Sequence, residues 1–239
     1  MPLLEIRGLR KSFGSVLAVD NVDLAVASGK ALGIIGPNGA GKTTLFNLIA
    51  GGLFPDAGTI HLDGRDIARA RPHERCMAGI ARTYQIPRPF EHLTVFENLL
   101  VAAVHSRRMP EANATQRCGE ILECCKLLSR ANAFAGSLTL LERKRLEMAR
   151  ALATAPRLLL LDEIAGGLTE AECIALVDSV KALRTTGITI IWIEHIVHAL
   201  VAVVDQLMVL NFGRKLAEGS PDVVMSSPKV KQIYMGIAA

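Results

Sequence analysis

One glycine-rich segment between two apolar runs constrains this chain more than any other part of its sequence. Read in order, the segment is Gly36, Pro37, Asn38, Gly39, Ala40, Gly41, Lys42, Thr43 and Thr44. Residues 31–35 before it favour a buried strand, and residues 45–50 after it favour a helix whose N-terminus attracts an anion. Because the segment matches G-x-x-x-x-G-K-[ST], it predicts a phosphate loop that binds a nucleoside triphosphate with Mg²⁺. In that loop, Lys42 would reach the outer phosphates and the Thr43 hydroxyl would bind the metal.

The composition is that of a folded chain with a mild positive charge. Half of the 239 residues are apolar, 21% are charged, and the net charge is +4. The basic cluster at 143–145 is short, so we expect no nucleic-acid partner. Residues 1–5 show no signal-peptide pattern, and no apolar run approaches the roughly 20 residues that span a bilayer. If a membrane is involved, we expect a partner protein to supply the spanning segments.

The cysteines favour a packing role. The chain has five, and no two form a C-x-x-C pair. Residues at helical spacing include two of them: Cys118, Ile121, Leu122 and Cys125. We expect these sulfurs in a core, which favours a reducing compartment without a metal centre or a disulfide framework.

The order of the predicted elements indicates an α/β fold around the phosphate loop. Early strands separated by turns predict a small antiparallel layer. They lie at residues 3–9, 22–26 and 59–62. From 91 to 155 the pattern is helical, with capping boxes that open at Thr94 and Thr139, and prolines after Ser220 and Ser227 predict two short final helices. Between these regions, apolar strands alternate with helices, which predicts a parallel sheet covered on both faces. These strands lie at 158–161, 188–193 and 206–210.

We therefore predict a phosphate-loop NTPase core with a mostly parallel sheet, a small antiparallel β layer and an inserted α-helical subdomain. The chain would form a single domain over residues 1–239. Within it, residues 1–85 and 156–239 would make the α/β core, and residues 86–155 the helical subdomain.

Polar side chains follow two of the predicted strands. Asp162 and Glu163 follow the strand at 158–161, and His195 follows the next strand along the chain. In open α/β sheets, ligands bind beyond the carboxyl ends of the strands, so these groups should converge on one triphosphate. Asp162 would share Mg²⁺ with Thr43, Glu163 would polarise the attacking water, and His195 would hydrogen-bond the γ-phosphate. The alternatives are solvated carboxylates and a structural histidine.

With these motifs, the chain resembles the ATP-binding subunits of ABC transporters over nearly all of its length. Residues 158–163 are similar to the family's Walker B strand with its catalytic glutamate, and His195 resembles the switch histidine. Gln85 stands where the Q-loop glutamine is expected, which implies a part in catalysis and in the metal site. Phe13 matches the aromatic residue that stacks on adenine, with a core phenylalanine as the alternative. The resemblance implies hydrolysis of ATP, with Mg²⁺ as the metal.

A narrower resemblance is to the ATPases of branched-chain, or hydrophobic, amino-acid importers. It rests on residues 80–85, 88–90, 93–98 and 143–150. It implies transmembrane permease subunits, a second ABC ATPase subunit in a homo- or heterodimer, and indirectly a soluble solute-binding protein. It also implies a peripheral position on the cytoplasmic face of the inner membrane. Residues 86–90 would couple the site to the membrane partner, with a plain surface loop as the alternative.

The signature loop of the family, usually L-S-G-G-Q, is altered in this chain to Leu138, Thr139, Leu140, Leu141 and Glu142. In the family this loop contacts the nucleotide of the opposite subunit, and Thr139 keeps a hydroxyl for that contact. Thr139 and Glu142 also match a capping box, which would satisfy their own helix instead. We hypothesise that in a heterodimer this chain supplies a complete phosphate-loop face and a weakened signature face, so that the partner's site is slow. The alternative is that the backbone N–H groups of the altered loop still serve the nucleotide.

Two other positions depart from the family pattern. Ile164 replaces the proline that usually follows the catalytic glutamate, and Thr169 replaces the Asp or Asn of the D-loop. The second change concerns communication across the dimer, since the D-loop normally lies at its interface.

Other functional classes remain open at this point. A phosphate-loop kinase would need an acceptor pocket and a lid, and would gain nothing from Gln85 or His195. A soluble ABC protein of translation or DNA repair usually carries two cassettes or a long coiled coil, whereas this sequence has one phosphate loop and no sustained heptads. An importer for another solute, such as urea, an amide or a lipid, would carry the same motifs.

Overall fold

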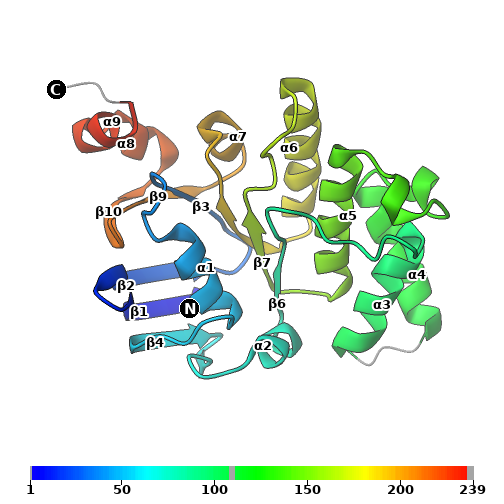
Figure 1. Cartoon of the computed structure of the whole chain (residues 1–239), viewed down its shortest axis with the longest axis horizontal. Coiled ribbons are helices and arrows are strands. Elements are labelled where there is room, and N and C mark those ends of the chain that lie inside the picture. The colour runs from blue at the N-terminus through cyan, green and yellow to red at the C-terminus, as the bar shows by residue number, and fades with distance from the viewer. Residues whose placement is uncertain (1, 108–110, 236–239) are drawn as a thin grey trace.

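The chain folds into two β-sheets with helices packed around them (Figure 1). The computed structural model describes residues 2–107 and 111–235. The larger sheet contains β3 (Ala31–Ile35), β6 (Ile80–Arg82), β7 (Leu158–Asp162), β8 (Thr189–Ile193), β9 (Gln206–Asn211) and β10 (Arg214–Gly219). Its strand order is β10-β9-β3-β8-β7-β6. All neighbours pair in parallel except β9 and β10, so β3, β7 and β8 end at the same edge.

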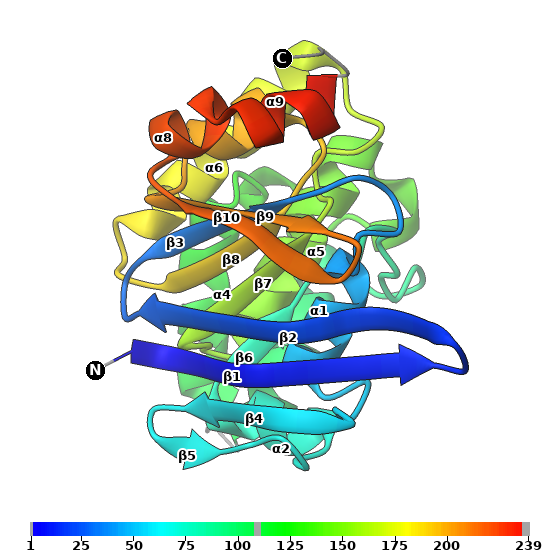
Figure 2. The ribbon, with the colours of Figure 1, turned by 90° about the vertical axis from the view of Figure 1, so that its left-hand side faces the viewer.

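The smaller sheet is entirely antiparallel, as the sequence predicted. Its strands are β1 (Pro2–Phe13), β2 (Val16–Ala27), β4 (Ala57–Leu62) and β5 (Arg65–Asp66), in the order β2-β1-β4-β5. The first two strands form a long hairpin that projects beyond the larger sheet (Figure 2). Both strands extend further than the predicted segments. The prediction stopped short because the outer part of the hairpin is exposed, as at Val16, and so lacks the alternation of apolar and polar residues that marks a half-buried strand.

Several of the helices begin where the sequence carries an N-terminal capping signal or a proline. The α-helices are α1 (Lys42–Ala50), α2 (Pro72–Ala78), α3 (Val95–Arg107), α4 (Glu111–Cys124), α5 (Leu140–Ala153), α6 (Glu170–Arg184), α7 (Val197–Val201), α8 (Pro221–Ser226) and α9 (Pro228–Met235). The Thr94 hydroxyl accepts from the Glu97 backbone N–H at 3.1 Å, and Thr139 and Thr169 cap α5 and α6 in the same way. The predicted capping boxes and final helices are therefore confirmed.

The core lies on both faces of the larger sheet. Successive strand residues point to opposite faces, so Leu158 and Leu160 pack with β1, β2, β4 and α1, whereas Leu159 and Leu161 pack with the helices α3 to α6. One face is thus covered mainly by the smaller sheet rather than by helices. Cys118 and Cys125 are fully buried in the helical half of the core, as predicted from their spacing. Helices α3, α4 and α5 group together at the end of the molecule away from β1 (Figure 1).

A buried aspartate joins the two sheets. Asp20 of β2 is 5% exposed, and its carboxylate accepts hydrogen bonds from Arg10 of β1 at 2.9 Å and from Arg214 of β10 at 2.6 Å. The backbone N–H of Asp20 donates to the Gly213 carbonyl at 2.8 Å. These contacts hold the hairpin against the edge of the larger sheet. Within residues 2–107 and 111–235, no helix has both the length and the apolar composition that a membrane crossing requires.

Candidate functional site

The phosphate loop connects β3 to α1 and is held in a tight turn by its own backbone. The Ala40 N–H donates to the Pro37 carbonyl at 3.1 Å. Gly41 caps α1 with a φ of 100°, and a Cβ at this position would lie 2.2 Å from the Ala18 carbonyl oxygen, so only glycine fits. A Cβ on Gly39, by contrast, would meet no atom within 4 Å, which leaves that side of the loop open to a ligand.

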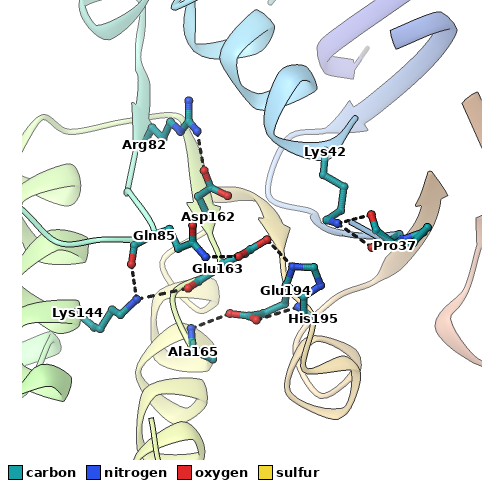
Figure 3. Close-up of polar contacts among 11 residues, drawn as sticks. Pro37, Lys42, Arg82, Gln85, Lys144, Asp162, Glu163, Ala165, Glu194 and His195 are labelled. Carbon is teal, nitrogen blue, oxygen red and sulfur yellow. Dashed lines mark hydrogen bonds and ion pairs between the residues drawn. The ribbon is translucent and has the colours of Figure 1, made fainter. Parts of the chain in front are cut away.

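Lys42 lies beneath the loop and is 5% exposed. Its Nζ donates to the Gly36 carbonyl at 2.7 Å and to the Pro37 carbonyl at 3.1 Å (Figure 3). Burial lowers the pKa of Lys42, while the nearby Glu163 and Asp162 carboxylates oppose that shift. The Lys42 ammonium group therefore donates hydrogen bonds to neutral carbonyl oxygens of the loop, and the two carboxylates act on it through space.

Asp162 ends β7 and forms an ion pair with Arg82 of β6. Arg82 Nη2 lies 2.6 Å from Asp162 Oδ2, and the two side chains are 10% and 7% exposed. Arg82 also donates to Asn47 Oδ1 of α1 at 2.5 Å. The Asp162 carboxylate thus has a fixed orientation beside a positive charge. Oxygen donors suit Mg²⁺, and Asp162, Thr43 and Gln85 each carry a side-chain oxygen of this kind.

Glu163 stands at the centre of a polar cluster at the carboxyl edge of the sheet (Figure 3). Its Oε2 accepts from Gln85 Nε2 at 2.6 Å, and its Oε1 lies 2.6 Å from His195 Nε2. Its backbone has a φ of 46°, in the left-handed region, and its N–H donates to the Ile193 carbonyl at 2.9 Å. The structure thus brings three sequence-predicted residues from separate parts of the chain into direct contact.

Two buried charged residues that the sequence analysis missed support this cluster. Lys144 of α5 donates to the Gln85 carbonyl at 2.5 Å and to the Glu163 carbonyl at 3.4 Å. Glu194 accepts from the Ala165 N–H at 2.7 Å and from the His195 N–H at 3.0 Å. Burial lowers the pKa of Lys144 and raises the pKa of Glu194. Two sequence signals were available. Lys144 precedes Met148 by four residues on the buried stripe of α5, and Glu194 directly follows the apolar run 190–193.

A pocket of about 400 Å³ opens above the phosphate loop. It is lined by Phe13, Val16, Leu17, Ala18, Asn38, Gly39, Ala40, Gly41, Lys42, Thr43, Thr44, Glu163 and Phe212. Phe13 ends β1, is 48% exposed, and has the Lys11 ammonium 5.7 Å from its ring centroid. It is therefore a pocket residue and not the core phenylalanine of the alternative interpretation. Phe212 was not predicted from the sequence.

Asp162 and Gln85 line a neighbouring cleft that continues along residues 84–88. Arg150 of α5 donates to the Arg88 carbonyl at 2.8 Å and lies 5.0 Å from the Phe90 ring centroid. Phe90 remains 48% exposed, and Ile86 is 68% exposed. The segment is therefore fixed at its backbone while it presents apolar side chains outward.

Thr139 does not line the phosphate-loop pocket of its own chain. Its N–H donates to Glu142 Oε2 at 2.9 Å, and the Glu142 N–H donates back to its hydroxyl at 3.3 Å. Arg130 Nε also lies 3.2 Å from Glu142 Oε1. The side chains of the altered signature loop therefore satisfy the N-terminus of α5 in this structure.

Fold and site together define a nucleotide-binding domain with a phosphate loop, a Walker B strand and a helical insertion. The family model described as "ABC transporter" matches residues 19–166. This chain is 37% identical, over 99% of both chains, to BraF of Pseudomonas aeruginosa and to LivG of Escherichia coli. Both of these relatives are high-affinity branched-chain amino acid transport ATP-binding proteins. A probable LivG of Methanocaldococcus jannaschii is 34% identical over 99% of this chain and 98% of its own. The chain therefore belongs to the ABC transporter family.

Solved structures agree with this assignment. A nucleotide-free ATP-binding cassette from an ABC transporter superposes with a TM-score of 0.89 at 33% identity, over 99% of this chain and 100% of that one. A cassette in its ADP conformation gives a TM-score of 0.90 at 34% identity, with the same coverage. These structures confirm the predicted α/β NTPase fold with its antiparallel layer.

Proposed function

We propose that this chain is the ATP-binding and ATP-hydrolysing subunit of an importer for branched-chain or other hydrophobic amino acids. The observation that carries the proposal is the contact of Glu163 with Gln85 and His195 beside the phosphate loop. Relatives that match the chain end to end and are named for branched-chain amino acid transport support the substrate class.

In the proposed reaction, the loop and the carboxylates divide the work. The N–H groups of residues 38–44 bind the phosphates, and Lys42 exchanges its two carbonyl partners for phosphate oxygens. Mg²⁺, held by Thr43, Asp162 and Gln85, supplies charge neutralisation for the phosphates when it is bound. Glu163 accepts the proton of the attacking water, and its two neighbours hold the carboxylate in position.

His195 and Gln85 would report the state of the site to the rest of the protein. The His195 imidazole would hydrogen-bond the γ-phosphate. Its Nε2 lies 2.6 Å from Glu163 Oε1, so it contacts the carboxylate that would activate the attacking water. Gln85 leads into residues 86–90, whose exposed Ile86 and Phe90 would contact a transmembrane permease subunit. Movement of this segment would transmit closure of the site to the permease.

Assembly would complete the site. A second ABC ATPase subunit, in a homo- or heterodimer, would place its signature loop over this phosphate loop, while Thr139 of this chain would face the partner's nucleotide. The two permeases would hold the subunit peripherally on the cytoplasmic face of the inner membrane, and a soluble solute-binding protein would deliver the amino acid. In this arrangement, residues 1–85 and 156–239 form the nucleotide-binding core and residues 86–155 form the helical subdomain.

The experiment is reconstitution. The chain is co-expressed with candidate permeases, and the complex is placed in liposomes with ATP and Mg²⁺ inside and a candidate binding protein outside. Leucine-loaded binding protein should stimulate phosphate release and leucine uptake, whereas urea, an amide or a lipid should not. If one of those solutes stimulates the complex instead of leucine, that solute is the transported substrate. If the chain hydrolyses ATP without associating with any permease, it is a soluble ABC ATPase.

A further inference from the structure

The turn between β9 and β10 places an exposed aromatic side chain at the rim of the nucleotide pocket. Phe212 is 83% exposed, which is the highest value among the large apolar side chains in the described part of the chain. Yet it lines the same pocket as Phe13, Lys42 and Glu163. A ring of this size gains free energy when a ligand in the pocket removes it from water.

The backbone at Phe212 adds a second cost. Its φ is 45°, in the left-handed region that glycine and asparagine adopt readily and that a bulky side chain adopts rarely. Described non-glycine residues with positive φ are Asn21, Asp63, Lys126, Ala155, Glu163 and Phe212. Of these, Glu163 and Phe212 line the pocket. Strained backbone of this kind clusters at active sites and ligand-binding segments.

The turn is held against the phosphate loop. The Gly213 N–H donates to the Ala40 carbonyl at 3.0 Å, and the Gly213 carbonyl accepts from the Asp20 N–H at 2.8 Å. A Cβ on Gly213 would lie 2.9 Å from the Ala18 carbonyl oxygen, so the close approach requires glycine at that position. These contacts tie the backbone beside Phe212 to the loop that would bind the phosphates.

The rest of the rim is also apolar. Phe13 is 48% exposed, Val16 63% and Leu17 40%, and all three come from the end of the β1–β2 hairpin. With the phosphates at the loop, the flat, weakly polar part of a nucleotide is the group that matches these surfaces. Aromatic side chains bind any nucleobase through its face.

We propose that Phe212 packs on the base of the bound nucleotide as a second aromatic wall, contributed by the β9–β10 turn in addition to Phe13. The proposal rests on the proposed ATP-binding function and adds a base-binding residue to it. In this proposal, the exposed ring and the strained backbone at Phe212 destabilise the free protein, and contact of the ring with the base strengthens nucleotide binding.

The test uses variants that remove the ring and relieve the strain at once. Phe212→Gly and Phe212→Asn both suit a positive φ, so both should raise the Tm of the purified chain while they weaken binding of ADP, measured by isothermal titration calorimetry. Base stacking of the usual strength predicts a rise in Kd of about 5- to 150-fold. Phe212→Tyr should bind ADP within about twofold of the wild type, because a ring is retained.

Two controls make the result specific. Inorganic tripolyphosphate, which has no base, should bind the wild type and the Phe212 variants equally. Phe134→Ala removes another exposed ring, 61% exposed and outside the pocket, and should leave the Kd for ADP unchanged. A Phe212→Gly variant with wild-type affinity for ADP, or one that loses ADP and tripolyphosphate to the same extent, overturns the proposal. Failure of the wild type itself to bind ADP would refute the nucleotide-binding function instead.

Discussion

Replacing Arg82 with methionine tests how strongly the Asp162 carboxylate depends on its buried ion pair. The two charged groups are 2.6 Å apart, and both side chains are at least nine-tenths buried. Removal of one partner leaves the other as an uncompensated buried charge, which costs about 3–5 kcal/mol of unfolding free energy. For a chain of this size, 1 kcal/mol corresponds to about 2–4 °C, so the Tm should fall by about 6–20 °C.

The measurement is urea unfolding and differential scanning calorimetry, with and without ADP and Mg²⁺. Arg157→Met is the matched control, because Arg157 pairs with Asp63 at 2.8 Å with side chains 46% and 61% exposed. A surface pair of this kind contributes at most about 1 kcal/mol. Mg²⁺ with ADP should narrow the gap between wild type and Arg82→Met, because a cation beside Asp162 replaces the lost charge. If Arg82→Met costs no more than Arg157→Met, the reasoning about the buried pair is wrong.

Three other changes probe the site and its supports. Glu163→Gln should lower single-turnover hydrolysis by the assembled complex about 10²- to 10⁴-fold while nucleotide affinity is retained, and a loss below tenfold would contradict its role as base. Leu141→Gly should raise the turnover of a heterodimeric complex, and an unchanged rate would remove the argument for a weakened signature face. Because burial raises the pKa of Glu194 above its ordinary 4.5, the folded state holds that proton more tightly, and this contribution to stability is lost as the pH rises. Glu194→Gln should therefore gain stability relative to wild type as the pH rises above 4.5 in urea unfolding; parallel pH profiles would contradict this.

Local patterns were sufficient for the elements that carry the nucleotide-binding motifs. The glycine loop, the apolar strand before Asp162 and the capping boxes each depend on residues within a few positions of one another. The expectation that Glu163 and His195 lie at the same edge of the sheet followed from the general rule that ligands bind beyond the carboxyl ends of parallel strands, whereas the strand order itself came from the structure.

Elements defined by long-range contacts were missed. β10 is an edge strand of mixed exposure, and its pairing with β9 is what makes it a strand. In α2, the fully buried residue is Arg75, whose guanidinium donates to carbonyls at the end of α1, including that of Ile49 at 2.9 Å. Burial lowers its pKa to about 10. Helices are predicted from apolar residues at helical spacing, and in α2 a charged residue occupies the buried position, so this signal is missing.

The Asp20 clasp has a consequence for exchanging parts between relatives. The hairpin that carries Phe13 and the turn that carries Phe212 are fastened to each other through Arg10, Asp20 and Arg214. A chimera that combines this antiparallel layer with a larger sheet lacking an arginine at 214 would keep the Arg10–Asp20 pair but lose the contact that ties Asp20 to β10. The apolar rim of the pocket is thus formed by two segments held together at Asp20, so we expect both segments to be needed when this rim is transplanted.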